Sequence, residues 1–342
     1  MEANSEGAMR ILVTGVAGFI GFHTALRLLD EGHEVVGIDN LNDYYDVSLK
    51  QDRLAQLTSR SGFSFIRLDL ADREGMAQLF SQHGFEVVVH LGAQAGVRYS
   101  LDNPFSYVDS NLTGTLTVLE GCRHHGIRHL IYASSSSVYG ANTKMPFSVA
   151  DRVDSPVSLY AATKKADELM CQAYAHLYRI PMTGLRFFTV YGPWGRPDMA
   201  YFKFADAIMA GRPIDVYNHG DMKRDFTYVD DVVDGIEALV RLEPTCLKDP
   251  VPHRVYNLGN NQPEQLLDMI SLLEQGLGRV AQKNFMPMQA GDVYATYAEI
   301  SASQQDFGFA PKTSLAAGLE KFAQWYATYR GDSSSDGGSK AS

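Results

Sequence analysis

Short apolar runs alternate along this chain with segments of helical periodicity. The runs are rich in β-branched residues and nearly continuous, which is typical of strands buried on both faces. They occupy residues 10–14, 34–38, 64–68, 86–90, 130–133 and 181–187, and residues 254–258 read as a further strand of the same sheet. Strands separated by helices predict an α/β fold with a parallel sheet covered on both faces.

The pattern loosens from about Gly192, where prolines interrupt it repeatedly. This region predicts a smaller, loop-rich lobe that is interleaved with the sheet domain. We expect a disordered tail at residues 1–9, a sheet domain at 10–190 together with about 225–260, and the lobe at 191–224 and 261–330. Residues 331–342 are rich in Ser and Gly and predict a second disordered tail.

Three glycines directly follow the first strand, spaced three residues apart. Gly15 permits a tight turn, Gly18 lets backbone N–H groups approach a pyrophosphate, and Gly21 lets the next helix pack on the strand. A phosphate then sits at a helix N-terminus, where free N–H groups favour an anion. By themselves the glycines also fit an ordinary strand–helix turn. In this context they predict a Rossmann-type, doubly wound sheet that binds a dinucleotide.

Two acidic residues end the second and third strands. Asp39 lies 18 residues after Gly21, where a carboxylate accepts hydrogen bonds from the adenosine ribose and repels a 2′-phosphate. This position favours NAD over NADP. Asp69 is placed to approach the adenine, and it also fits a helix cap or a loop carboxylate.

A tyrosine and a lysine four residues apart open a helical segment at residues 158–179. Tyr160 and Lys164 therefore share a helix face. Free tyrosine is a poor base at neutral pH because its pKa is about 10, and a nearby ammonium stabilises the phenolate. The serine run at residues 134–137 ends the fifth strand and supplies a hydroxyl donor. Each pattern is weak alone, but their combination with the glycine loop predicts redox chemistry on an alcohol.

Composition narrows the class of protein. Apolar residues make up 45% and the formal charge is −10, so the chain is globular and lacks the basic face that nucleic acids need. The first residues do not resemble a secretion signal, and no apolar run is long enough to span a membrane. The three cysteines, Cys122, Cys171 and Cys246, form no C-x-x-C pair. We expect a cytoplasmic protein with no metal site, no nucleic-acid partner and no membrane partner.

Four long motifs resemble the extended short-chain dehydrogenases/reductases, and within them the UDP-glucuronate 4-epimerases. The resemblance covers about residues 10–330. The motifs are HLGAQAGVRYSLDNPFSYVDSNLTGTLTVLEGCRH at 90–124, YASSSSVYG at 132–140, RFFTVYGPWGRPDMA at 186–200 and KRDFTYVDDVV at 223–233. The resemblance implies that the sheet domain binds NAD and the lobe binds a UDP-sugar.

The resemblance also implies roles for individual residues. Tyr160 is the catalytic base and acid, Lys164 also binds the nicotinamide ribose, and Ser135 is the catalytic hydroxyl. The residues expected to bind NAD are Gly15, Gly18, Phe19, Ile20, Gly21, Asp39, Asn40, Asp69, Leu70, Ala93, Tyr160, Lys164 and Tyr191. Those expected to bind the substrate are Arg98, Asn111, Ser136, Ser137, Thr189, Arg196, Arg224 and Asp292. Two positions depart from relatives: Gly92 replaces an alanine, and Gln289 replaces an arginine near the nucleotide, which leaves the diphosphate contacts there open.

The implied reaction is epimerisation at C4 of UDP-glucuronate to UDP-galacturonate through a 4-keto intermediate. Sugar-nucleotide dehydratases carry Asp and Glu where this chain has Ser136 and Ser137, so dehydration is disfavoured. Decarboxylation of UDP-glucuronate stays open, and Ser136, Ser137, Thr189 and Arg196 are candidates to hold the carboxylate against it. Epimerisation of another UDP-hexose or of an N-acetylated UDP-uronate also stays open. A non-enzymatic NAD sensor would be expected to have a broken Y-x-x-x-K motif, but Tyr160 and Lys164 are intact.

Two predicted helices, at residues 106–125 and 158–179, carry apolar residues on more than one face. In the resembled family the equivalent helices form a four-helix interface. We therefore expect a homodimer.

Overall fold

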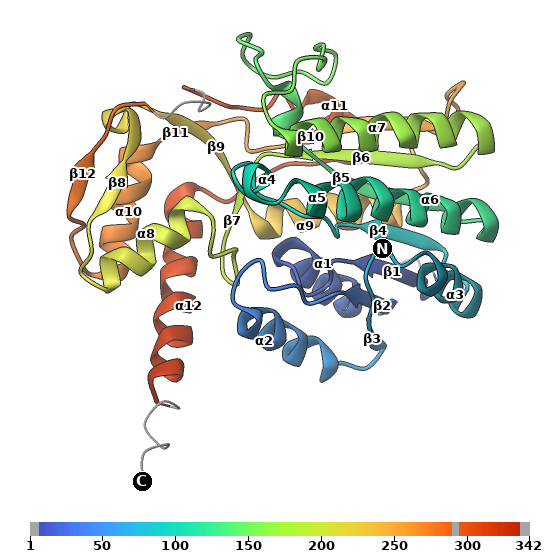
Figure 1. Ribbon diagram of the computed structural model, residues 1–342, viewed down its shortest axis with the longest axis horizontal. Coiled ribbons are helices and arrows are strands. Elements are labelled where there is room, and N and C mark those ends of the chain that lie inside the picture. Colours follow the sequence, from blue (N-terminus) through green and yellow to red (C-terminus); the bar gives the residue numbers. More distant parts are fainter. Residues whose placement is uncertain (1–6, 289–293, 336–342) are drawn as a thin grey trace, which may run out of the picture.

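A seven-stranded parallel sheet forms the centre of the protein. The computed structural model describes residues 7–288 and 294–335, and Figure 1 shows its arrangement. The strand order is β10-β6-β5-β4-β1-β2-β3, and every pair is parallel. The strands are β1 Arg10–Thr14, β2 Glu34–Asp39, β3 Phe63–Arg67, β4 Val87–His90, β5 His129–Ser135, β6 Met182–Phe187 and β10 His253–Leu258. All seven predicted strands are confirmed, and with them the α/β doubly wound fold.

Helices cover both faces of this sheet. One layer contains α1 Phe19–Asp30, α2 Val47–Thr58 and α9 Val229–Arg241, and the other contains α3 Arg73–His83, α6 Gly114–His125 and α7 Leu159–Tyr178 (Figure 1). Strand β1 shows why the strands read as continuous apolar runs. Ile11 and Val13 belong to the core under the first layer, and Leu12 belongs to the core under the second. Both faces of each strand are therefore buried.

The helix predicted at residues 106–125 has a widened turn. The chain forms α4 Tyr99–Asp102, α5 Pro104–Tyr107, a π-helical turn η1 Val108–Thr113 and then α6. The expected regular helix is therefore corrected at its N-terminal half. Periodicity alone does not foresee a π-turn, because one inserted residue leaves the apolar pattern on either side intact.

The smaller lobe lies beside one end of the sheet (Figure 1). Its three-stranded sheet has the order β11-β9-β7, and β8 pairs with β12. Its elements are β7 Thr189–Tyr191, α8 Ala200–Met209, β8 Ile214–Val216, η3 Tyr217–Gly220, β9 Lys223–Tyr228, β11 Pro263–Gln265, α10 Leu266–Leu277, β12 Lys283–Phe285 and α12 Leu315–Ser335. The chain passes from β9 through α9 to β10 of the main sheet before it returns to the lobe. The short helix α11 Ser301–Phe307 packs against β10.

Both ends of the folded chain lie further out than the predicted tail boundaries. Met9 is buried in the core, and α12 continues past residue 331 to Ser335. Helix α12 extends this far because its buried residues Phe322 and Tyr326 anchor it to the lobe. The remainder of the predicted tails, residues 1–6 and 336–342, lies outside the described residues. Among the described helices, none combines the length and the apolar character needed to cross a membrane.

Candidate active site

One large cavity runs from the glycine loop across the carboxyl ends of the central strands and into the lobe. Its volume is about 790 Å³, and its walls include Gly15 of the glycine loop and Arg224 of the lobe. It opens beside β1 and β4, where the strand order reverses direction. Ligands of open α/β sheets bind at this switch point, because the loops that follow neighbouring strands diverge there.

The glycine loop forms a cradle that side chains would fill. Gly15 has a φ of +69°, and a Cβ on it would lie 2.7 Å from the backbone of Gly92. A Cβ on Gly21 would lie 2.2 Å from the carbonyl oxygen of Gly15. Gly18 is the N-cap of α1 and supplies no side-chain cap, so the helix presents backbone N–H groups to the cavity. The cradle fits a pyrophosphate.

The acidic residues lie next to this cradle. The Asp39 carboxylate accepts hydrogen bonds from the backbone N–H groups of Ala17, at 3.2 Å, and Leu41, at 2.8 Å. Burial raises the pKa of Asp39, and the Lys50 ammonium opposes that shift. The Asn40 amide donates to Asp69, which also accepts from the N–H of Ala71 as a loop carboxylate does.

The residues expected to bind the adenosine and pyrophosphate therefore share one wall. Gly15, Gly18, Phe19, Ile20, Gly21, Asp39, Asn40, Asp69, Leu70 and Ala93 all line the cavity. The cradle and the carboxylate of Asp39 fit NAD with an unmodified ribose.

Arg53 is a structural residue of this site that the sequence pattern did not reveal. It is fully buried in α2, and its guanidinium donates to the carbonyl oxygens of Ala17, Trp194 and Gly195. It also donates to the Tyr45 hydroxyl at 2.7 Å. Arg53 thereby ties the glycine loop to the loop that enters the lobe. A single arginine on a polar helix carries no sequence signal of such a role.

The predicted catalytic pair, Tyr160 and Lys164, lies in the first turns of α7. Ser158 caps α7 by accepting from the N–H of Ala161, which places Tyr160 in the first turn and Lys164 one turn later. Both residues line the cavity. The Lys164 ammonium donates to the Ala133 carbonyl at 3.0 Å and to Asp167 at 3.3 Å. Its position is therefore set by strand β5 and by its own helix.

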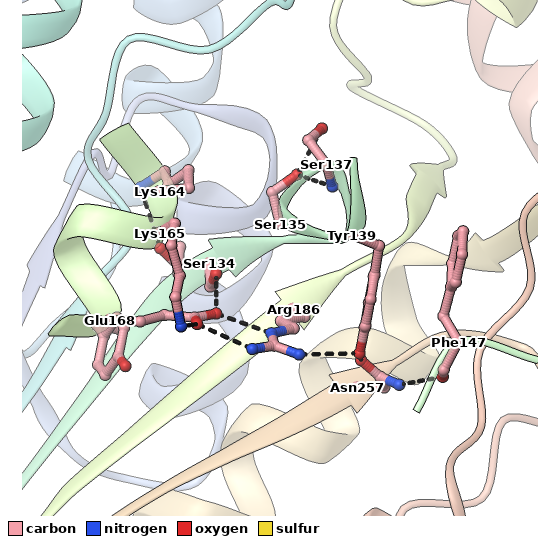
Figure 2. Close-up of polar contacts among 12 residues, drawn as sticks. Ser134, Ser135, Ser137, Tyr139, Phe147, Lys164, Lys165, Glu168, Arg186 and Asn257 are labelled. Carbon is pink, nitrogen blue, oxygen red and sulfur yellow. Dashed lines mark hydrogen bonds and ion pairs between the residues drawn. The ribbon is translucent and has the colours of Figure 1, made fainter. Parts of the chain in front are cut away.

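The serines at the end of β5 face two directions. Ser135, Ser136 and Ser137 line the cavity. The Ser135 hydroxyl donates to the Ser137 hydroxyl at 3.1 Å and accepts from the N–H of Ser137 (Figure 2). Ser134 points away from them and donates to Glu168 of α7 at 2.7 Å. Ser135 is the last residue of β5, and the short helix η2 Ser136–Tyr139 carries the other two cavity-lining hydroxyls.

A buried polar network packs against the turn formed by residues 134–137. Glu168 receives two hydrogen bonds from Arg186 of β6, at 2.8 and 2.9 Å. Arg186 donates to the Tyr139 hydroxyl, which donates to Asn257 of β10 (Figure 2). Burial by itself raises the pKa of Glu168, but the hydrogen bonds and charge of Arg186 outweigh it and lower that pKa. The network links α7, η2 and the two neighbouring strands, and so fixes the serines relative to Tyr160.

The wall of the cavity contains an ion pair between Arg196 and Asp198. Arg196 and Asp198 both line the cavity, and Tyr44 donates a hydrogen bond to Asp198 at 3.0 Å. Burial raises the pKa of Tyr44 to about 12, and the Asp198 carboxylate acts in the same direction. Thr189, Arg98 and Arg224 line the same region. Arg98 lies over the ring of Tyr217, 5.9 Å from its centre.

Two predicted site residues do not reach the cavity. Asn111 is only 1% exposed, and its amide binds the backbone N–H and carbonyl of Gln94 and the Thr163 hydroxyl. Gln94 lines the cavity, so Asn111 supports its wall from the π-turn. Its hydrogen bonds in this structure are therefore structural, and the substrate contact stays a prediction.

Tyr191 is the second predicted residue that does not line the cavity. Its side chain is fully buried in the lobe, and its hydroxyl donates to the Ser314 carbonyl at 3.2 Å. The ring packs against Tyr228 and Gly318. Two further predicted positions, Asp292 and Gln289, lie outside the described residues.

The fold and the cavity define an NAD-binding protein with a Ser/Tyr/Lys site, and a family comparison agrees. Residues 11–259 match the NAD dependent epimerase/dehydratase family. The chain belongs to this family.

Individual relatives are similar over nearly the whole chain. A probable UDP-glucuronate 4-epimerase of Rhizobium meliloti is 50% identical over 93% of this chain and 97% of its own length. UDP-glucuronate 4-epimerase 1 of Arabidopsis thaliana is 47% identical over 96% of this chain and 79% of its own length. The structure is similar to that of a UDP-glucuronic acid 4-epimerase from Bacillus cereus in complex with UDP-glucuronic acid and NAD. The TM-score is 0.84, with 36% identity, over 94% of this chain and all of that one.

These comparisons confirm the resemblance that the motifs carried and the NAD cofactor.

Proposed function

We propose that this protein is a UDP-glucuronate 4-epimerase, which interconverts UDP-glucuronate and UDP-galacturonate. One observation carries the proposal: Tyr160, Lys164 and Ser135 line the same cavity as the glycine cradle and Arg196. The cradle fits the dinucleotide, and Arg196 offers a cation to the sugar carboxylate. The relatives that are similar over nearly the whole chain bear the same activity in their names.

Each group in the cavity has a defined task in this reaction. The glycine cradle and Asp39 would hold NAD, which would supply reversible hydride chemistry at C4 of the sugar. Tyr160 takes the proton from O4 and later gives it back, while the Lys164 ammonium stabilises the phenolate. Ser135 holds the O4 position through its hydroxyl. The sheet domain thus holds the cofactor and the lobe holds the UDP-sugar.

The carboxylate of the substrate needs its own binding groups. A 4-keto uronate is a β-keto acid, and it loses CO₂ when the breaking C–C bond aligns with the carbonyl π system. Ser136, Ser137, Thr189 and Arg196 hold the carboxylate near the carbonyl plane and so suppress that loss. Hydroxyls at positions 136 and 137 do not supply the acid and base that dehydration requires.

The protein forms a homodimer through α6 and α7 in this proposal. Large apolar side chains are exposed along this outer face: Leu101, Phe105, Leu116, Leu169 and Leu177 are 39 to 80% exposed. The two helices contact each other and lie on the same side of the sheet (Figure 1). A second copy packed on this face completes a four-helix bundle. The three cysteines are buried and unpaired, which supports a reducing compartment such as the cytoplasm.

The decisive experiment is incubation of the purified protein with UDP-glucuronate, without added NAD, followed by NMR of the sugar. Appearance of UDP-galacturonate supports the epimerase and shows that NAD is retained. A UDP-pentose with release of CO₂ identifies a decarboxylase instead. Turnover of a neutral UDP-hexose or an N-acetylated UDP-uronate, with UDP-glucuronate unchanged, identifies an epimerase with a different substrate. No change in any of these sugars overturns the proposed chemistry.

A further inference from the structure

Besides Glu168, a second buried carboxylate, that of Asp167, lies next to Lys164. Asp167 follows Lys164 by three residues on α7, and the Asp167 Oδ2 atom is 3.3 Å from the Lys164 ammonium nitrogen. The two side chains are 1% and 3% exposed. Asp167 Oδ1 is also buried and accepts no hydrogen bond from any group in the part of the chain that the structure describes. The proposed proton transfer uses no group at this position.

Groups from four neighbouring elements determine the charge balance around Asp167. Glu168 is neutralised by its paired hydrogen bonds with Arg186 of β6. Burial raises the pKa of Cys171 and Tyr132, so both stay protonated and neutral. The remaining neighbours are Thr115 of α6, which lowers the pKa of Asp167, and His90 of β4 beside Lys164, whose pKa burial lowers to about 3. Asp167 is therefore the carboxylate that balances the Lys164 charge.

We propose that Asp167 is a positioning residue for the catalytic pair, and that its carboxylate opposes the field of Lys164 at the Tyr160 hydroxyl and so limits formation of the phenolate. This inference rests on the proposed epimerase function. Lys164 favours the phenolate because its positive charge lies one turn from Tyr160. A negative charge behind that lysine weakens the same field.

The size of the effect follows from helix geometry. Asp167 is seven residues from Tyr160, which corresponds to about 10 Å along the helix axis. A unit charge at that distance shifts an ionisation equilibrium by about one pH unit at an effective dielectric constant of about 20. Burial raises the pKa of Asp167 to about 6, against the opposing effect of Lys164. The carboxylate is therefore half ionised near pH 6, mostly charged about one pH unit above that value and mostly neutral about one pH unit below it.

This balance suits a reaction that runs in both directions. Tyr160 must take a proton from O4 in the first half and return it in the second. A tyrosine that ionised too readily would remove the proton well and return it poorly. In this proposal, the Asp167 charge keeps Tyr160 able both to accept the O4 proton and to return it.

The test compares the pH dependence of kcat with UDP-glucuronate for the natural protein and for Asp167→Asn. Asparagine keeps the shape and removes the charge. We expect the acid limb of the profile to move to lower pH, by about one pH unit at most. The two profiles should converge about one pH unit below pH 6, where the natural carboxyl is also mostly neutral.

A second readout does not depend on turnover. Ultraviolet absorption reports tyrosinate formation in the NAD-bound protein, and subtraction of a matched Tyr160→Phe variant isolates Tyr160. Its midpoint should move to lower pH in Asp167→Asn. Glu120→Gln, which removes a part-exposed carboxylate on α6, is the control and should leave both curves in place.

Two outcomes overturn the inference: unchanged midpoints, or a shift to higher pH, in folded Asp167→Asn protein. If that variant does not fold, Thr115→Val replaces it. Loss of the Thr115 hydroxyl makes the Asp167 charge harder to hold, so the shift should have the same direction and a smaller size, and its absence is equally contradictory. A natural protein that does not turn over UDP-glucuronate contradicts the proposed function, and the tyrosinate titration then still decides the role of Asp167.

Discussion

The Arg196 guanidinium is held in a forked ion pair by Asp198, two residues further along the chain. Arg196 Nε lies 3.0 Å from Asp198 Oδ1, and Nη2 lies 2.5 Å from Oδ2. Tyr44, from the loop that follows Asp39, donates to the same carboxylate. The cation proposed to hold the sugar carboxylate is thus fixed in place by a group from the cofactor half of the cavity. This contact joins the two halves of the site.

Replacing Arg196 with histidine should release CO₂ from the 4-keto intermediate, or abolish turnover. Histidine is shorter and lacks the forked geometry, so the carboxylate is no longer held near the carbonyl plane. The measurement is CO₂ release and NMR of the sugar product. Arg212→His, at an exposed position, is the control. Normal epimerisation without CO₂ in the Arg196→His variant would remove this residue from the carboxylate site.

Replacing Tyr160 with phenylalanine should lower kcat by about 10²- to 10⁴-fold, because the proton on O4 has no acceptor. Circular dichroism and the content of bound NAD should stay unchanged, since the ring still packs near Tyr107. Full activity in this variant would refute the assignment of Tyr160 as the base.

Replacing Gly15 with alanine should release NAD and destabilise the loop. The added Cβ would lie 2.7 Å from the backbone of Gly92, in addition to the strain of a φ of +69°. Gly84→Ala is a matched control, because Gly84 has a φ of +56° and open space around it. Nucleotide released from the denatured protein is the measurement. Equal NAD content in the two variants would show that the close approach to Gly92 does not form the cradle.

Replacing Glu168 with glutamine should lower the free energy of unfolding by about 3 to 5 kcal/mol, because Arg186 would remain buried without its counter-ion. Lys165→Met is the comparison, since Lys165 forms the more exposed contact with the same carboxylate, and it should cost about 1 kcal/mol or less. Denaturant unfolding measures both. If the two variants lost similar amounts of unfolding free energy, the Glu168–Arg186 pair would not be the main stabilising contact of Glu168.

Acid should destabilise the protein through its buried histidines. Burial lowers the pKa of His129 to about 3, and its neutral ring donates to the Leu239 carbonyl and accepts from the Thr183 hydroxyl. Below pH 6.5 the unfolded chain binds a proton that the folded protein does not, so the contribution is full above pH 6.5 and declines toward pH 3.

One such histidine costs up to about 1.4 kcal/mol for each pH unit in that window. Asp225 acts in the opposite direction between its ordinary pKa of 3.8 and about 6, the value to which burial raises it. Unfolding measured at pH 7, 6 and 5 should therefore show a smaller loss for His129→Gln than for the natural protein. An equal loss would mean that His129 is not among the groups that set the acid response.

The central sheet could be predicted from sequence because its signal is local. A strand buried on both faces needs an apolar side chain at nearly every position, as Ile11, Leu12 and Val13 show. The glycine cradle was predictable for a similar reason. Gly18 and Gly21 both lie against the carbonyl oxygen of Gly15, so their steric demands arise within one short stretch of chain, whereas the contact of Gly15 with Gly92 is long-range.

The supports of the site could not be predicted in this way. Arg53, Asp198 and Arg186 act on groups more than 15 residues away or on the other lobe, and their sequence neighbourhoods resemble ordinary polar positions. Asn111 and Tyr191 show that a motif match does not determine which way a side chain points. Their motifs match the family, yet the π-turn and the packing of the lobe turn both side chains away from the cavity.

The sequence by itself determined the parallel sheet, the dinucleotide loop and the Tyr160–Lys164 pair, because periodicity, steric demand and helix spacing act over short stretches of chain. The tertiary structure alone decided which polar groups meet in the interior. Burial sets that outcome: removed from water, Lys164, Asp167, Glu168 and Arg186 must find partners, and only the folded chain determines which partners lie within reach.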